Sequence, residues 1–325
     1  MHRSFGALFD TLRWLVYLVG CFAVSAPAAN ALRLEATIPL GDVASRIDHL
    51  AVDPTRRRLF VAELVANRVA VIDLDGRTVL RTIDRLAEPQ GVAYEPTADT
   101  LYVANGGDGS VRLYAAATFE SIGRIELRDD ADNVRIDATN RRVLVGYGHG
   151  LAAIDPRTHA LRTFALGGHP EAFQVEPKTA RILINVPPAH AVVVLDAKGR
   201  AQRRPIPLPG SNYPLALDDL GQLVLPLRHP ATLLVMHDHR TSTAELCDDA
   251  DDVFFDAHRK RLYVSCGDGR VDVFERRDAN YVRIDEVATA QGARTSLFVA
   301  AWDRLYLAVP AATDRPAAVW VMAPN

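Results

Sequence analysis

A weak repeat of about forty residues recurs seven times between Arg46 and the C-terminus. Each unit contains an apolar strand segment, an acidic residue that opens a turn, and a second apolar segment, as residues 47–62 show most plainly. The acidic residue recurs after 42, 42, 39, 42 and 38 residues, and an alanine takes its place 44 residues later. These positions are Asp53, Glu95, Asp137, Glu176, Asp218, Asp256 and finally Ala300. A period in this range indicates a solenoid, a propeller or an array.

Most units contain four short segments rich in Val, Ile, Leu and Tyr, bounded by Gly, Asn, Pro or Asp, which is typical of buried strands. Seven such units predict an all-β fold, a seven-bladed β-propeller of four-stranded blades, which protects sheet edges by radial repetition. The seventh unit has only three strand segments, and residues 34–40 have no partner in the first unit. We therefore expect this N-terminal strand to complete the last blade and close the ring.

Residues 1–31 have the features of an export signal. Arg3 and Arg13 flank a short basic region, residues 14–24 form an apolar run, and small residues lead to a cleavage site after Ala31. Eleven apolar residues are too few to span a bilayer. We therefore predict a signal peptide over residues 1–31.

The rest of the chain, residues 32–325, is expected to form one propeller domain. No later apolar stretch approaches twenty residues, so we expect a periplasmic or secreted monomer with no transmembrane span. An alternative stays open, because residues 18–21 resemble a lipobox and would anchor the protein to lipid through Cys21.

The composition argues against nucleic acid as a partner. The formal net charge is −3, so the chain has no positive electrostatic field that would attract phosphates. Hydrophobic residues make up 49% of the chain, which is enough to form a core. The expected partner is a small polar ligand or a periplasmic protein.

The second unit carries the motif that links the chain to a known family. Residues 101–105, Leu-Tyr-Val-Ala-Asn, are followed by Gly109, Ser110 and Val111, and this segment resembles the YVTN repeat of YncE-like β-propellers. The resemblance covers nearly all of residues 32–325. It implies the propeller fold, but members of the family include binding proteins, a DNA-binding protein and lactonase-like enzymes, so it implies no single activity.

In a propeller, the crossover into each blade lies around one mouth of the central channel. Positions four and five residues before each repeat anchor fall on these crossovers, and they include five carboxylates. Side chains that crowd like charges together in a partly desolvated mouth favour a bound cation or polar ligand. The candidate ligand-binding residues on or next to these positions are Asp48, His49, Gln90, Asp132, Asn133, His169, Glu171, Asn212, Asp251, Asp252 and Arg294. A structural interpretation is also open, in which each polar side chain bonds to the backbone of the neighbouring blade.

Two functional hypotheses follow from these crossover residues, and the sequence does not decide between them. The first is a binding module that uses this face of the propeller. The second is a lactonase-like hydrolase in which a divalent cation polarises a carbonyl, with Arg294 steadying an anionic substrate. The candidate metal ligands are His49, Asp132, Glu171 and Asp252. No Ser-His-Asp order supports a covalent mechanism.

Two cysteines lie in the predicted propeller domain. Cys247 should end the last strand of the fifth unit and Cys266 the second strand of the sixth, so both should reach the same face. We therefore expect a disulfide bond, which an oxidising compartment permits. Two small buried thiols are the alternative.

Overall fold

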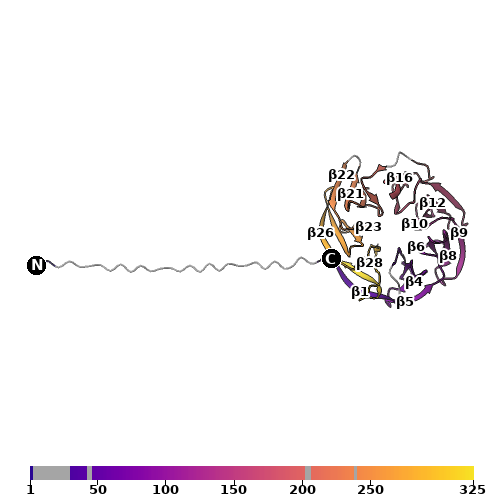
Figure 1. Cartoon of the computed structure of the whole chain (residues 1–325), viewed down its shortest axis with the longest axis horizontal. Coiled ribbons are helices and arrows are strands. Elements are labelled where there is room, and N and C mark those ends of the chain that lie inside the picture. Colours follow the sequence, from indigo (N-terminus) through magenta and orange to yellow (C-terminus); the bar gives the residue numbers. More distant parts are fainter. Residues whose placement is uncertain (3–29, 42–45, 202–205, 238–239) are drawn as a thin grey trace.

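Seven antiparallel sheets form a ring in the computed structural model, which describes residues 1–2, 30–41, 46–201, 206–237 and 240–325 (Figure 1). The predicted all-β, seven-bladed propeller is therefore confirmed. Most of the predicted signal segment and Cys21 lie outside the described residues. Within the described part of the chain, no helix has the length and apolar character needed to cross a membrane.

The first three blades are regular, and in each one the strands pair in chain order. The first blade comprises β2 (Leu50–Asp53), β3 (Arg58–Glu63), β4 (Arg68–Asp73) and β5 (Thr78–Ile83). The second comprises β6 (Pro89–Glu95), β7 (Thr100–Asn105), β8 (Ser110–Ala115) and β9 (Ser121–Glu126). The third comprises β10 (Ala131–Asp137), β11 (Arg142–Tyr147), β12 (Gly150–Ile154) and β13 (Leu161–Ala165).

The fourth, fifth and sixth blades keep this order with local irregularities. The fourth comprises β14 (Phe173–Val175), β15 (Ile182–Val186), a single 3₁₀ turn η1 (Pro187–Ala189), β16 (Ala191–Leu195) and β17 (Ile206–Pro207). The fifth comprises β18 (Ser211–Asn212), β19 (Ala216–Leu217), β20 (Leu223–Arg228), β21 (Thr232–His237) and β22 (Arg240–Glu245). The sixth comprises β23 (Ala250–Asp256), β24 (Arg261–Cys266), β25 (Arg270–Arg277) and β26 (Asn280–Ala288).

The innermost strand of the fifth blade is broken in two. Both β18 and β19 pair with β20, and residues 213–215 between them stand outside the ladder. Pro214 lies in this gap, and proline has no N–H group to donate to a neighbouring strand. This sheet therefore contains five strand segments where the repeat predicts four.

The seventh blade joins the two ends of the described propeller. It comprises β27 (Ser296–Val299), β28 (Arg304–Val309), β29 (Ala317–Pro324) and, as its outer strand, β1 (Leu32–Gly41). Strand β1 runs antiparallel to β29, with Leu32 opposite Pro324 and Ile38 opposite Val319. The predicted closure by the N-terminal strand is confirmed, and Figure 1 shows β1 beside the C-terminus.

The core is divided among the blade interfaces. Seven hydrophobic clusters each combine residues of two successive blades, because each twisted sheet packs one face on the sheet before it and one on the sheet after it. The cluster between the last and first blades includes Ile38 of β1, Ile72 of β4 and Val319 of β29. Side-chain packing between successive sheets is thus a main contribution to holding the ring together.

The acidic repeat anchors form turns on the face opposite the crossovers. The Asp53 carboxylate accepts hydrogen bonds from the backbone N–H groups of Thr55 and Arg56 at 2.9 and 3.1 Å. Equivalent bonds to backbone N–H groups are made by Glu95, Asp137, Asp218 and Asp256. Glu176 differs, because its carboxylate bonds to the Thr179 hydroxyl and the Arg181 side chain. These acids stabilise turns, and the remaining acidic cluster of interest lies on the other face.

Candidate functional site

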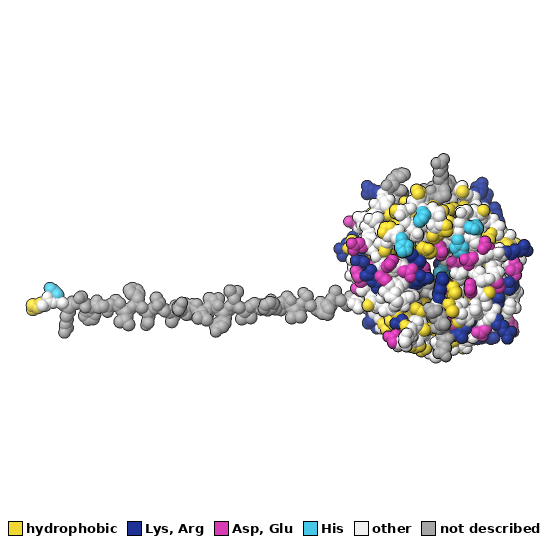
Figure 2. All heavy atoms as spheres, in the orientation of Figure 1, with side chains coloured by type: hydrophobic (Ala, Val, Ile, Leu, Met, Phe, Trp, Pro, Cys, Tyr) yellow, Lys and Arg dark blue, Asp and Glu magenta, His cyan; other side chains and the backbone are white. Residues whose placement is uncertain are grey.

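The predicted site residues lie where the innermost strand of each blade begins. Asp48 and His49 precede β2, Gln90 is in β6, Asp132 and Asn133 in β10, His169 and Glu171 precede β14, Asn212 is in β18, Asp251 and Asp252 in β23, and Arg294 precedes β27. The innermost strands line the channel, so these residues surround one of its ends, which we call the mouth. Figure 2 shows acidic, basic and histidine side chains gathered around the centre of the ring.

Some of these polar groups join neighbouring blades. The Asp252 carboxylate accepts a hydrogen bond from the backbone N–H of Ser296 at 2.8 Å, and the backbone N–H of His49 donates to the Gln90 carbonyl at 3.2 Å. Asn212 of the fifth blade donates to the carbonyl of Ala191 in the fourth blade at 3.2 Å. The structural interpretation of the crossover residues therefore holds for part of the set.

A buried ion pair occupies the first crossover. His49 Nδ1 lies 3.0 Å from Asp48 Oδ1, and Arg46 donates to the other Asp48 oxygen at 3.1 Å. Burial opposes the charged imidazolium, but the adjacent Asp48, with Asp252 and Asp132 further away, raises the pKa of His49 to about 10. His49 is therefore a cation at neutral pH, held inside a ring of acids.

A second group joins the third and fourth blades. One ligand atom each from Asp132, His169 and Glu171 lies within 4.8 Å of the other two. His169 Nε2 is 3.7 Å from Asp132 Oδ2, and its Nδ1 is 3.9 Å from Asp130 Oδ2. Burial, together with the charge of Asp132, raises the pKa of Glu171 to about 8. The structure thus groups two of the predicted metal ligands with His169, whereas His49 and Asp252 belong to other parts of the mouth.

Arginines neutralise the acids of the fifth and sixth blades. Arg294 donates to Asp249 at 2.9 Å and its Nε lies 3.2 Å from Asp251. Arg228 lies 3.2 Å from Asp249, contacts Asp251, and stacks over the Tyr213 ring at 3.9 Å from its centroid. Arg294, which the hydrolase hypothesis assigned to an anionic substrate, is therefore already paired with two carboxylates.

A cavity of about 460 Å³ lies in the channel. It is lined by the innermost strands of six blades and by residues 214–215 of the fifth. Its charged lining residues are His49, Asp252 and Arg135, and its walls are otherwise mostly apolar. Burial lowers the pKa of Arg135, and the charges of Asp252 and Asp132 oppose that shift.

Arg135 is absent from the residues chosen from sequence. It lies two residues after the crossover position Asn133, so the alternation of side chains along β10 turns it to the channel while Val134 packs between blades. The repeat could have identified Arg135, because it lies two residues before the anchor Asp137. Equivalent positions hold Ala51, Ala93, Gln174, Ala216, Phe254 and Phe298, so Arg135 is the single charge at this level of the channel in the described residues.

Several buried polar atoms at the mouth have no hydrogen-bond partner among the described residues. They include His49 Nε2, Asp132 Oδ1, Asn133 Oδ1 and Asn212 Oδ1. Asp132 is 6% exposed and Asn133 is 2% exposed, so bulk solvent reaches little of either side chain. A buried polar atom without a partner costs about 1–3 kcal/mol, which a ligand, ion or bound water would recover.

The raised pKa of Glu171 predicts how the free energy of unfolding depends on pH. The folded state favours protonated Glu171, so its contribution is complete below its ordinary pKa near 4.5 and is lost as pH rises to about 8. In the presence of a chelator, we expect the free energy of unfolding to fall from pH 5 to pH 8. Glu171→Gln should reduce this fall by roughly 1–3 kcal/mol, measured by denaturant unfolding at each pH.

The control is Glu126→Gln, which removes a half-exposed carboxylate on the outer strand β9. It should leave the pH dependence unchanged. An equal fall in the Glu171→Gln and wild-type proteins would contradict the assignment.

Comparison with solved structures finds the same fold in proteins of unrelated sequence. A chain of Kuenenia stuttgartiensis hydrazine synthase matches with a TM-score of 0.72 and 15% identity over 81% of this chain and 92% of that one. A chain of the mitotic checkpoint complex matches with a TM-score of 0.76 and 12% identity, over 95% and 98% of the two chains. A streptogramin B lyase matches with a TM-score of 0.72 and 9% identity, over 90% and 98%. At these identities the likeness establishes the propeller fold alone.

Comparison at the level of sequence adds no relative. No protein-family model matches the chain. No curated protein matches it either. The propeller part of the resemblance to YVTN-repeat proteins is therefore confirmed, and membership of that family stays a prediction.

Proposed function

We propose that this chain is an exported propeller that binds a small polar ligand at the mouth and in the channel beneath it. A cavity of about 460 Å³ is within the range of small-molecule sites, which supports a small ligand over a protein partner. Export is supported by the predicted signal segment and by the disulfide bond between Cys247 and Cys266, since such bonds persist in oxidising compartments.

One observation carries the proposal. The cavity lies at a mouth with charges of both signs, and buried polar atoms there lack partners within the described residues. Purely structural polar groups would be expected to find protein partners, as the Gln174 amide finds Leu215 and Leu217. The unsatisfied atoms of Asp132 and Asn133 instead remain available to a ligand.

A screen of polar metabolites by thermal shift tests this function. We expect at least one compound to raise the melting temperature, and Asp132→Asn to weaken its binding at least about tenfold. The control is Asp75→Asn, which removes an exposed carboxylate paired with Arg57 away from the mouth. A screen without a stabilising compound, or equal losses in both variants, would contradict the proposal.

A second candidate is a cation-dependent hydrolase, favoured by the Asp132, His169 and Glu171 group. Ligand atoms within 4.8 Å of one another suit one ion at about 2.0–2.6 Å from each. A bound divalent cation would polarise a carbonyl or activate water. The likeness to a streptogramin B lyase supports only the point that this fold can carry an enzyme.

Elemental analysis and hydrolysis of a lactone panel test the second candidate. We expect a stoichiometric divalent metal that Asp132→Asn releases and Asp75→Asn retains, with turnover that a chelator abolishes. If a metal is bound but no lactone is hydrolysed, the result supports a binding module that uses a cation. If neither metal nor turnover is found, it supports a binding module without a metal.

A further inference from the structure

The channel has two levels with opposite chemistry. At the mouth, acids outnumber bases, with Asp48, Asp130, Asp132, Glu171 and Asp251 around the opening. At the next level inward the single charged group among the described residues is Arg135, and its neighbours around the ring are mainly Ala and Phe. A ligand that enters this channel therefore meets negative charge first and positive charge second.

Arg135 stands apart from the other arginines near the mouth. Arg46, Arg228 and Arg294 each have a carboxylate at 3.2 Å or less. Arg135 has none within 4.0 Å in the described structure, and its one hydrogen bond there runs from Nη1 to the carbonyl of the preceding residue at 2.9 Å. Arg135 also lines the cavity. A guanidinium presents a planar fork that binds a carboxylate through two parallel hydrogen bonds.

Gln174 shows what a structural residue does at the same position of the next blade. Its amide donates to the carbonyl of Leu215 at 3.1 Å and accepts from the N–H of Leu217 at 3.2 Å, so it joins the fourth and fifth blades. Arg135 makes no such link to a neighbouring blade in the described residues. The contacts of the described residues therefore leave most of its guanidinium donors available to a ligand.

Asp252 brings a carboxylate to the same cavity, where burial raises its pKa to about 7 against the opposing effect of nearby His49. Asp252 is 8% exposed. One of its carboxylate oxygens accepts a hydrogen bond from the backbone N–H of Ser296 at 2.8 Å, whereas the other accepts none from the described residues. The cavity lining also includes the apolar side chains of Leu215, Phe254 and Leu297. The lining therefore offers a site for an anion, a site for a cation and an apolar surface.

Resting on the proposed small-ligand function, we infer that the channel binds a zwitterion with an apolar body, an amino acid or short peptide, whose carboxylate pairs with Arg135 and whose ammonium pairs with Asp252. A simple anion would have to pass the acidic mouth without compensation. A simple cation would leave Arg135 desolvated and unpaired. A molecule with both charges satisfies both groups.

Titration calorimetry with charge-deleted analogues tests the inference. The probes are the apolar amino acids and their dipeptides, with phenylalanine, phenylalaninamide and hydrocinnamate as a matched set that carries both charges, only the ammonium, or only the carboxylate. We expect at least one zwitterion to bind at millimolar concentration or below, and each single-charge analogue to bind at least about tenfold more weakly.

Variants assign each charge to its residue. Arg135→Gln should weaken the zwitterion at least about tenfold and leave the affinity for its amide unchanged, whereas Asp252→Asn should leave the affinity for the deaminated acid unchanged. Arg135→Lys, which keeps the charge but loses the fork, should give an intermediate loss and serves if the glutamine variant does not fold. The control Arg124→Gln, a half-exposed arginine of β9, should bind as the wild type does.

The inference is overturned if no zwitterion in the panel binds, if either analogue binds as tightly as the zwitterion, or if Arg135→Gln binds normally. In those cases a hit among other polar compounds in the thermal-shift screen would preserve the proposed function. If neither experiment finds a ligand, the proposed function fails as well.

Discussion

Replacing Ile38 by alanine is expected to destabilise the protein by roughly 2–5 kcal/mol. Ile38 is fully buried in β1, opposite Val319, and packs in the cluster between the last and first blades. The substitution removes apolar atoms and leaves a cavity at the seam that closes the ring. Because a protein of this kind is stable by only about 5–15 kcal/mol, the loss should be plain in a denaturant unfolding curve.

Leu34→Ala is the matched control for this prediction. Leu34 lies on the same strand but is 46% exposed, so its truncation should cost less than about 1 kcal/mol. Equal losses in the two variants would show that β1 contributes no buried contact at position 38, and the closure of the ring would have to be reconsidered.

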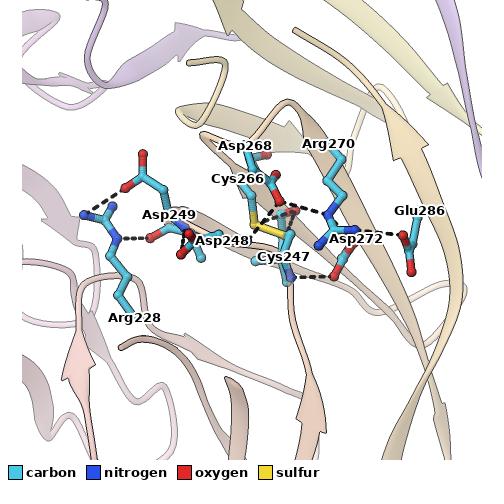
Figure 3. The surroundings of a disulfide bond; sticks show 12 residues. Arg228, Cys247, Asp248, Asp249, Cys266, Asp268, Arg270, Asp272 and Glu286 are labelled. Atoms are coloured by element: carbon cyan, nitrogen blue, oxygen red, sulfur yellow. Dashed lines mark hydrogen bonds and ion pairs between the residues drawn. A yellow bond between two sulfur atoms is a disulfide. The ribbon is translucent and has the colours of Figure 1, made fainter. Parts of the chain in front are cut away.

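Removing the disulfide bond by a Cys247→Ala, Cys266→Ala double substitution should cost about 3 kcal/mol in the chain-entropy model. The bond joins residues 19 apart, between the end of the fifth blade and β24, and both side chains are fully buried. Figure 3 shows it beside Asp249, whose carboxylate is an ion partner of Arg228 at the mouth, and the N–H of Cys247 donates to Asp272 at 2.8 Å.

Reduction provides an internal control. A reducing agent should lower the stability of the wild type by the same amount and leave the double variant unaffected, as measured by guanidinium unfolding. Peptide mapping under non-reducing conditions should recover the two cysteine peptides as one linked species. Two separate peptides with free thiols would refute the bond.

The architecture was open to prediction because it depends on a repeated pattern. The spacing of acidic turn residues such as Asp53 and Glu95 places every strand in register, and the unpaired N-terminal segment predicts β1. The break between β18 and β19 was not predicted, although Pro214 is its visible cause. A repeat pattern shows the features that the blades share, but it does not show where one blade deviates from the common strand arrangement.

The chemistry of the mouth could be predicted only in part. Counting back from the anchors selected Asp132 and Glu171, which the structure brings close to His169. It could not show that Arg294 is paired with Asp249 or that Arg135 has no carboxylate partner in the described structure, because such facts depend on side-chain positions within about an ångström. The count also stopped at the crossover and so missed the next inward-facing residue of β10.

The alternation along the innermost strands separates specificity from stability. Val134 packs in the cluster between the second and third blades, whereas Arg135, one position further on, lines the channel and makes no link to a neighbouring blade in the described residues. An exchange at Arg135 is therefore expected to change what the channel can recognise and to leave the packing of the blades in place. Substitution at such a position is therefore a way in which one fold takes a different ligand without a change of its core.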